Sequence, residues 1–169
     1  MLRWLTEKIV SNVHEGGTIL ERTVRAQMTG SDHEGATIVA AIAGLLGTVA
    51  YADRSYAPLE EERIRDELRR VGALTTAGVD AICAVLRQHI VEISTVEAPV
   101  YARELLELAD RDLRLQVLDA LVDLAAADDE ITVAETNVLR LTATALGLSQ
   151  QDYNASQSRH RDKLKVLRK

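Results

Sequence analysis

The sequence predicts an all-α fold, a single bundle of about seven to nine helices, and three observations lead to it. Apolar residues recur at helical spacing along most of the 169-residue chain. The composition contains no Phe and one Trp and is rich in Ala, Leu and Val, which favours closely packed helices over a sheet. Two Pro and nine Gly leave little room for long loops.

The clearest predicted element is a helix–turn–helix over residues 113–146. Its first helix carries an apolar face made by Leu113, Val117, Leu118, Leu121, Leu124 and Ala125. A short acidic turn follows. The second helix then begins with a capping box, in which the side chains of Thr132 and Glu135 each bond the other residue's backbone N–H. Gly147 is a natural residue to end that helix.

The carboxylates of this turn have two interpretations. Asp128 and Glu130 follow the carboxyl end of a helix, where the helix dipole disfavours negative charge. Either they form a solvated turn beside a good cap, or they join Glu135 in binding a divalent cation. Ca²⁺ and Mg²⁺ are the favoured cofactors, because hard cations prefer oxygen ligands. An EF-hand is excluded, because the sixth position counted from Asp128 is not Gly and the twelfth is Leu139.

The same pattern occurs 75 residues upstream. Asp53 and Glu60 are seven positions apart, as are Asp128 and Glu135. The preceding helices also match, with Ile42, Leu46, Val49 and Ala50 in register with Val117, Leu121, Leu124 and Ala125. We therefore predict an internal pseudo-two-fold helix–turn–helix repeat rather than a solenoid, which needs more copies.

These residues resemble a known family. The run Leu-Ala-Ala-Ala-Asp-Asp-Glu-Ile-Thr-Val-Ala-Glu over 124–135, followed by Ala-Leu-Gly-Leu-Ser over 145–149, is similar to the tellurite resistance protein TerB. It is also similar to the TerB-like domain of the DnaJ-like membrane co-chaperone. The resemblance covers residues 38–153. It implies an all-helical domain, an acidic surface that binds cations, and a stress-linked role without catalysis.

Carried over by position, the acidic residues that the resemblance assigns to cation binding are Asp53, Glu60, Asp128, Glu130 and Glu135. The family usually has Gly where this chain has Arg54 in the first turn and Asp129 in the second. Ser55 and Ala57 also replace the second carboxylate and the capping Thr in the first turn. The cation site predicted in the first turn is therefore the weaker one.

The expected organisation is one globular unit with three parts. These are an N-terminal helical arm over 1–30, a TerB-like domain over 31–153 and a basic C-terminal helix over 154–169. The arm carries an apolar stripe made by Leu2, Leu5, Ile9 and Val13, beside Trp4. This stripe either packs on the bundle or lies in a membrane interface. A signal peptide is not expected, because Glu7 interrupts the apolar run.

The helix over 32–52 is apolar almost all round from Ile38, which predicts a place at the centre of the bundle. Its apolar part is shorter than the roughly 20 residues of a membrane span. Gly44 and Gly47 predict close packing against neighbouring helices. Further on, Ser94 and Glu97 predict a capping box and hence the start of a new helix.

Charge is distributed unevenly along the chain. The net charge is −6, which argues against general nucleic-acid binding, yet the residues from Arg159 onward comprise six basic and one acidic. This basic end either contacts a partner or an anionic membrane, or folds back on the acidic body. The single cysteine, Cys83, lies among apolar residues and is expected to be a buried structural thiol.

No phosphate loop, Cys/His metal set or nucleophile–base pair is visible, so an enzyme is not expected. The sequence favours a cytoplasmic TerB-like module that binds a divalent cation at its acidic turns. It would mediate protein interactions in metal or envelope stress. The alternative is a metal-independent adaptor at a membrane surface or on a protein partner. The sequence leaves the oligomeric state open.

Overall fold

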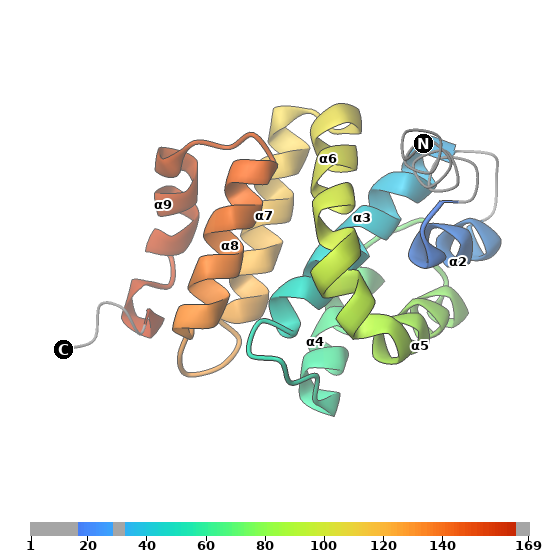
Figure 1. The fold of residues 1–169 in the computed structure, drawn as a ribbon, viewed down its shortest axis with the longest axis horizontal. Coiled ribbons are helices and arrows are strands. Elements are labelled where there is room, and N and C mark those ends of the chain that lie inside the picture. Colours follow the sequence, from blue (N-terminus) through green and yellow to red (C-terminus); the bar gives the residue numbers. More distant parts are fainter. Residues whose placement is uncertain (1–16, 29–32, 165–169) are drawn as a thin grey trace, which may run out of the picture.

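The computed structural model describes residues 17–28 and 33–164, which form helices joined by short turns (Figure 1). The α-helices are α2 (Ile19–Gln27), α3 (His33–Ala50), α4 (Pro58–Arg69), α5 (Thr76–Glu92), α6 (Ala98–Leu108), α7 (Arg111–Ala125), α8 (Val133–Ala145) and α9 (Gln150–Ser158). A π-helix, η1 (Ile93–Glu97), lies between α5 and α6, and a 3₁₀ helix, η2 (Arg161–Lys163), follows α9. The described residues contain no strand, only one isolated bridge between Ile131 and Leu164. The all-α prediction is confirmed.

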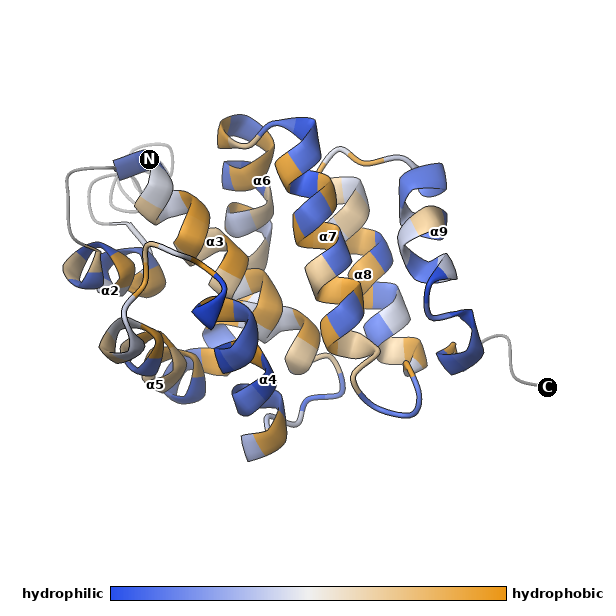
Figure 2. Cartoon of the chain, turned by 180° about the vertical axis from the view of Figure 1, so that it is seen from behind, coloured by the Kyte–Doolittle hydropathy of each residue, from blue (hydrophilic) through white to orange (hydrophobic). Residues whose placement is uncertain are grey.

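Helix α3 is the centre of the bundle. It contacts α2, α5, α6 and α7, and Figure 2 shows that it is hydrophobic along most of its length. Its length and composition would suit a membrane span, but 61% of it is buried inside the bundle. Burial of this extent is typical of the core helix of a globular domain.

Two glycines bring α3 close to its neighbours. A Cβ at Gly44 would lie 2.4 Å from two ring carbons of Tyr101, whose side chain is fully buried. A Cβ at Gly47 would lie 2.9 Å from Cδ2 of Leu86. Because glycine has no side chain, α3 can pack closely against its neighbours at both positions. The predicted close packing is confirmed.

The predicted capping box at Ser94 is wrong. The chain passes from α5 to α6 through the π-helix η1, which packs against α3. Ile93 of η1 is fully buried. Pro99 lies in the first turn of α6 and has no N–H to donate to a carbonyl four residues earlier. A wider π turn accommodates that missing bond, so the helical path bends here without ending.

The helices of the second half begin at residue types that favour N-caps. Asp110 Oδ1 accepts a hydrogen bond from Leu113 N at 2.8 Å, so it opens α7. Ser149 Oγ accepts one from Asp152 N at 3.1 Å and opens α9. Gly147 adopts a φ of +68° after α8, a conformation that favours Gly.

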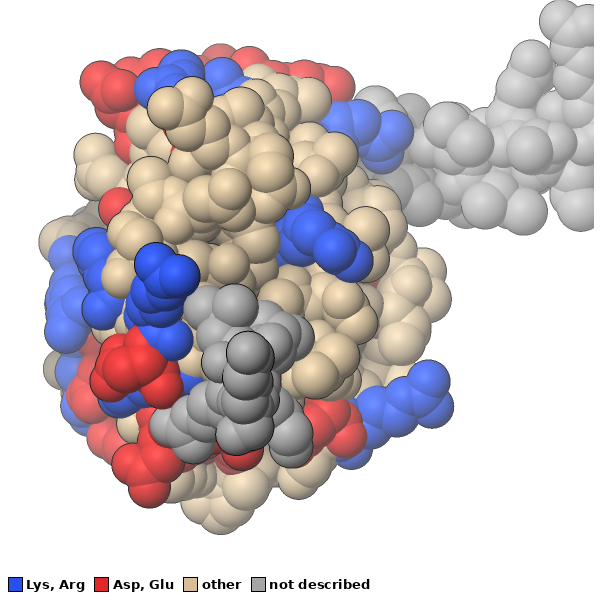
Figure 3. Space-filling view, turned by 90° about the vertical axis from the view of Figure 1, so that its left-hand side faces the viewer, with Lys and Arg blue, Asp and Glu red and all other residues tan. Residues whose placement is uncertain are grey.

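The basic C-terminal end folds back on α7. Helix α9 ends at Ser158, within the C-terminal helix predicted over 154–169, and the 3₁₀ helix η2 follows it. The Nη2 atom of Arg159 lies 3.1 Å from a carboxylate oxygen of Asp119 and 3.2 Å from one of Asp123. Figure 3 looks onto this end of the molecule and shows acidic and basic side chains lying against one another. Of the two alternatives for the basic end, the described part follows the intramolecular one.

Several predictions lie outside the described residues. They are the N-terminal stripe with Trp4, the start of the helix predicted over 32–52, and the end of the C-terminal helix predicted over 154–169. Residues 1–16, 29–32 and 165–169 are not described. The domain boundaries at 30 and 153 stay predictions.

Candidate functional site

The two acidic turns lie side by side at one end of the bundle (Figure 1). We call residues 51–57, between α3 and α4, the first elbow, and residues 126–132, between α7 and α8, the second elbow. Arg63 of α4, the helix that follows the first elbow, binds the second elbow. Its Nη2 atom donates to Asp128 Oδ1 at 2.6 Å and to the carbonyl oxygen of Ala127 at 3.3 Å.

The second elbow is closed by the predicted capping box. Glu135 Oε2 accepts hydrogen bonds from Thr132 N at 2.7 Å and from Thr132 Oγ1 at 2.9 Å. Thr132 Oγ1 in turn accepts one from Glu135 N at 3.1 Å. Burial raises the pKa of Glu135, the bonds from Thr132 lower it, and the charges of Asp128 and Asp53 raise it further. A negative charge from each elbow therefore raises the pKa of the same carboxyl group, that of Glu135.

The first elbow has half of the same cap. Glu60 Oε2 accepts a hydrogen bond from Ala57 N at 2.7 Å, but Ala57 has no side-chain oxygen to complete the box. Pro58 compensates by opening α4 without an N–H that needs a partner. Asp53 Oδ1 accepts from Ser55 N at 2.8 Å and so closes the turn on itself.

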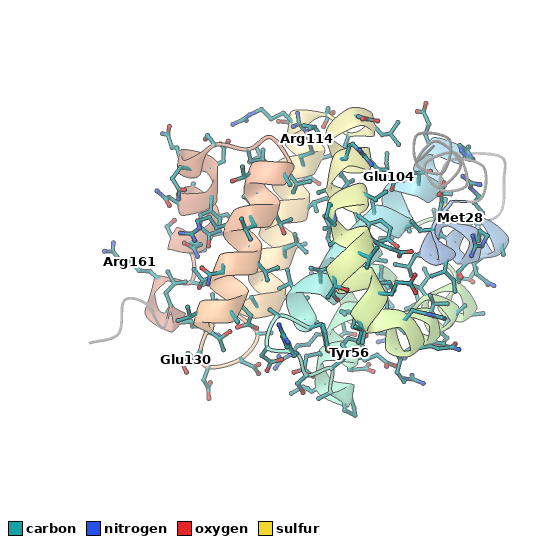
Figure 4. The ribbon with its side chains drawn as sticks, in the orientation of Figure 1. Met28, Tyr56, Glu104, Arg114, Glu130 and Arg161 are labelled. Atoms are coloured by element: carbon teal, nitrogen blue, oxygen red, sulfur yellow. The ribbon has the colours of Figure 1, made fainter. Side chains whose placement is uncertain are left out.

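The elbows differ in backbone conformation at the position where the family usually has Gly. Arg54 has a φ of +66°, in the left-handed region that disfavours residues with a Cβ. Asp129 has no such φ, so the second elbow makes its turn without this strain. Glu130 lies in the α7–α8 loop at the edge of the bundle (Figure 4).

Groups of the protein itself engage carboxylates at both elbows. Within residues 17–28 and 33–164, no three His, Cys, Asp or Glu side chains are grouped to hold a metal ion. The hydrogen bond from Arg63 holds the pKa of Asp128 below its usual range, and the charge of Lys163, whose Nζ donates to the Ala126 carbonyl at 2.8 Å, adds to the effect. Cation binding by Asp53, Glu60, Asp128, Glu130 and Glu135 therefore stays a prediction.

The family model described as tellurite resistance protein TerB matches residues 39–158. The chain belongs to the TerB family. The match includes both elbows and agrees with the resemblance seen in the motifs. Neither the comparison with curated proteins nor that with solved structures found a match.

Sequence reasoning missed Arg63. It lies in the charge-rich stretch of α4, and its spacing from Glu60 suggests only a helix-surface contact. Its partner Asp128 is 65 positions away, so only the fold brings them together. A basic residue one turn after the capping Glu was the sole local signal.

Sequence reasoning also missed a cavity of about 640 Å³ lined by residues of α2, α3 and α6. Glu104 lies there between α6 and α3 (Figure 4). Burial raises its pKa to about 7, and the charges of Glu21 and Glu107 add to the effect. Glu21 is itself buried, and it pairs with Arg25 and accepts a hydrogen bond from Thr37 at 2.8 Å.

Proposed function

We propose that this TerB-family chain is a non-enzymatic protein-interaction module in which Arg63 holds the second elbow against α4 without a metal. The observation that carries the proposal is the hydrogen-bonded ion pair between Arg63 and Asp128. It supplies inside the protein the positive charge that the sequence alone assigned to a cation. The TerB family is generally not catalytic, which supports the non-enzymatic part.

The outer face of α8 supports an interaction role. Val133 and Leu141 are 47% and 68% exposed. Eight positions separate them, so they lie on the same side of the helix. Exposed apolar side chains that share a face are typical of surfaces that bind other proteins. The setting we propose is the cytoplasm, in the response to metal or envelope stress.

Calorimetric titration with Ca²⁺ and Mg²⁺ tests the metal-independent part. The wild-type chain and the Arg63→Gln variant should give no saturable heat. Addition of EDTA should leave the melting temperature unchanged, because no ion contributes to the folded state. The interaction part is tested by proximity labelling in cells. Leu141→Asp should lose neighbours that the wild type and the control Gln151→Asp, at an exposed position of α9, both label.

A second candidate is a divalent-cation site that forms when Arg63 moves away. It is favoured by the concentration of negative charge around this one guanidinium. The hydrogen bond to Asp128 raises the pKa of Arg63, and the charges of Glu60 and Glu135 raise it further. In that case Arg63→Gln should bind Ca²⁺ or Mg²⁺ more tightly than the wild type, and the added Asp128→Asn should abolish the heat.

Peripheral membrane contact is the remaining alternative. The basic end is partly neutralised by Asp119 and Asp123 in the structure, which weakens its attraction to anionic lipid. Trp4 lies outside the described residues. Co-sedimentation with phosphatidylserine vesicles at low salt decides the matter, and membrane contact requires that the full chain sediment.

A further inference from the structure

A second, smaller cavity lies beside the first elbow. Its volume is about 280 Å³, and it is lined by the end of α3, the first elbow, the α5–η1 junction and α8. This volume is just below the range of about 300–1,000 Å³ that is usual for small-molecule sites. The cavity therefore suits one or two aliphatic side chains rather than a large ligand.

The wall of this cavity is mainly apolar. Val91 of α5 contributes a side chain that is 57% exposed, and Val138 of α8 lies across from it, half-buried. Tyr51 adds an aromatic side chain from the first elbow. Among the described residues that line the cavity, none is acidic, although the chain as a whole carries a net charge of −6.

One polar group in the wall has no partner. The Oγ atom of Ser94 is buried and makes no hydrogen bond within the described residues. Ser94 belongs to the π-helix η1, a type of distortion that is frequent at functional sites. A buried hydroxyl without a hydrogen bond costs folding free energy, so a ligand that accepts from Ser94 would recover that cost.

The one positive charge in the wall is also unpaired. The guanidinium of Arg54 makes no ion pair or side-chain hydrogen bond with the residues that the structure describes. Arg54 also keeps a φ of +66°, where Gly would be unstrained. The guanidinium of Arg54 lies beside an apolar cavity and pairs with no described carboxylate. Its charge and planar shape suit it to bind the carboxylate of a ligand.

We propose that this cavity binds the C-terminal end of a partner protein whose last residue is a small aliphatic one. The aliphatic side chain would lie against Val91 and Val138. The terminal carboxylate would accept hydrogen bonds from Arg54 and Ser94. A chain terminus is the one protein group that joins an aliphatic side chain and a carboxylate through a single carbon. The inference rests on the proposed interaction function and names the chemistry of the partner.

Fluorescence anisotropy with a fluorescein-labelled pentapeptide, Gly-Ser-Gly-Val-Val with a free carboxylate, tests this. The wild type should bind it saturably, and the same peptide with a C-terminal amide should bind about tenfold more weakly or worse. Arg54→Gln should weaken binding of the free acid by a similar factor and bind both peptides alike. Arg140→Gln, an exposed arginine of α8 outside the cavity, is the matched control and should bind as the wild type does.

Ser94→Ala provides a second readout, because it removes an unpartnered hydroxyl and should leave the melting temperature unchanged or higher. Its affinity for the free acid should fall several-fold. Equal binding of acid and amide by the wild type, or unchanged binding by Arg54→Gln, would overturn the proposal. Such a failure leaves the cation titrations of the elbows unaffected, because they contain no peptide.

Discussion

The first and second elbows share a sequence pattern but meet different parts of the chain. Each follows an apolar helix and places an Asp seven positions before a capping Glu. The second elbow is bound from three sides, by its full capping box, by Arg63, and by the bond from Ile131 N to the Lys163 carbonyl at 2.8 Å. The first elbow has half a cap and a strained Arg54, and it borders a cavity.

The difference shows that a repeated motif does not by itself repeat a chemistry. The carboxylates of the second elbow are engaged by groups that the sequence does not place near them. The first elbow keeps an unpaired guanidinium in a wall without acidic side chains. The two copies are therefore expected to respond differently to matched substitutions.

The largest effect should come from the helices that precede the elbows. Gly44→Ala places a Cβ 2.4 Å from ring carbons of buried Tyr101 and should cost about 3 kcal/mol of unfolding free energy. The matched position before the second elbow is Asp119, which is 48% exposed, and Asp119→Ala should cost about 1 kcal/mol or less. Urea unfolding measures both, and equal costs would contradict the difference in packing.

The caps should respond in opposite directions. Thr132→Ala removes the acceptor for Glu135 N and should cost about 1–2 kcal/mol. Ala57→Ser supplies the missing acceptor at a residue that already has N-cap φ and ψ, and it should gain about 0.5–1 kcal/mol. Chemical denaturation at constant pH checks both, and a loss for Ala57→Ser would mean that the half cap is not the weaker one.

The strain at the first elbow predicts a smaller gain. Arg54→Gly should raise the unfolding free energy by about 0.5 kcal/mol, because Gly adopts φ near +66° without a Cβ clash, although it also frees the unfolded chain. Asp129→Gly should lower it by a similar amount through added freedom of the unfolded chain. Arg54→Ala is the control. It keeps the Cβ, so its melting temperature should not rise above that of the wild type.

The smallest effect belongs to the ion pair between α4 and the second elbow. A double-mutant cycle with Arg63→Gln and Asp128→Asn should give a coupling of about 0.2–0.5 kcal/mol at pH 7, modest because Asp128 is half-exposed. The pKa of Asp128 is lowered on folding, so this contribution is present above the ordinary Asp pKa of about 3.9. It is lost as the pH falls below that value, and coupling that persisted at pH 2 would rule out an ionic origin.

The local elements of the fold followed from local patterns. The cap at Thr132 and the close approach at Gly44 were predicted, because a cap or a glycine acts through neighbours in sequence or through missing volume. The π-helix at Ser94 was not, because it depends on how buried Ile93 packs against α3.

The candidate site was predicted only in part. The sequence placed carboxylates at or next to both elbows and favoured a cation at each, more weakly at the first, but it did not show that Arg63 lies beside Asp128. The cavity beside the first elbow was missed for the same reason, since its wall combines residues from four separate segments.

The sequence by itself determined the helices, their caps, the family and the acidic character of the elbows, because these depend on residues within a turn or two of one another. The tertiary structure decided which charges meet, which hydroxyl stays unpaired and which apolar side chains line a cavity. Such contacts join residues tens of positions apart, and the free energy of packing, rather than any local preference, selects them.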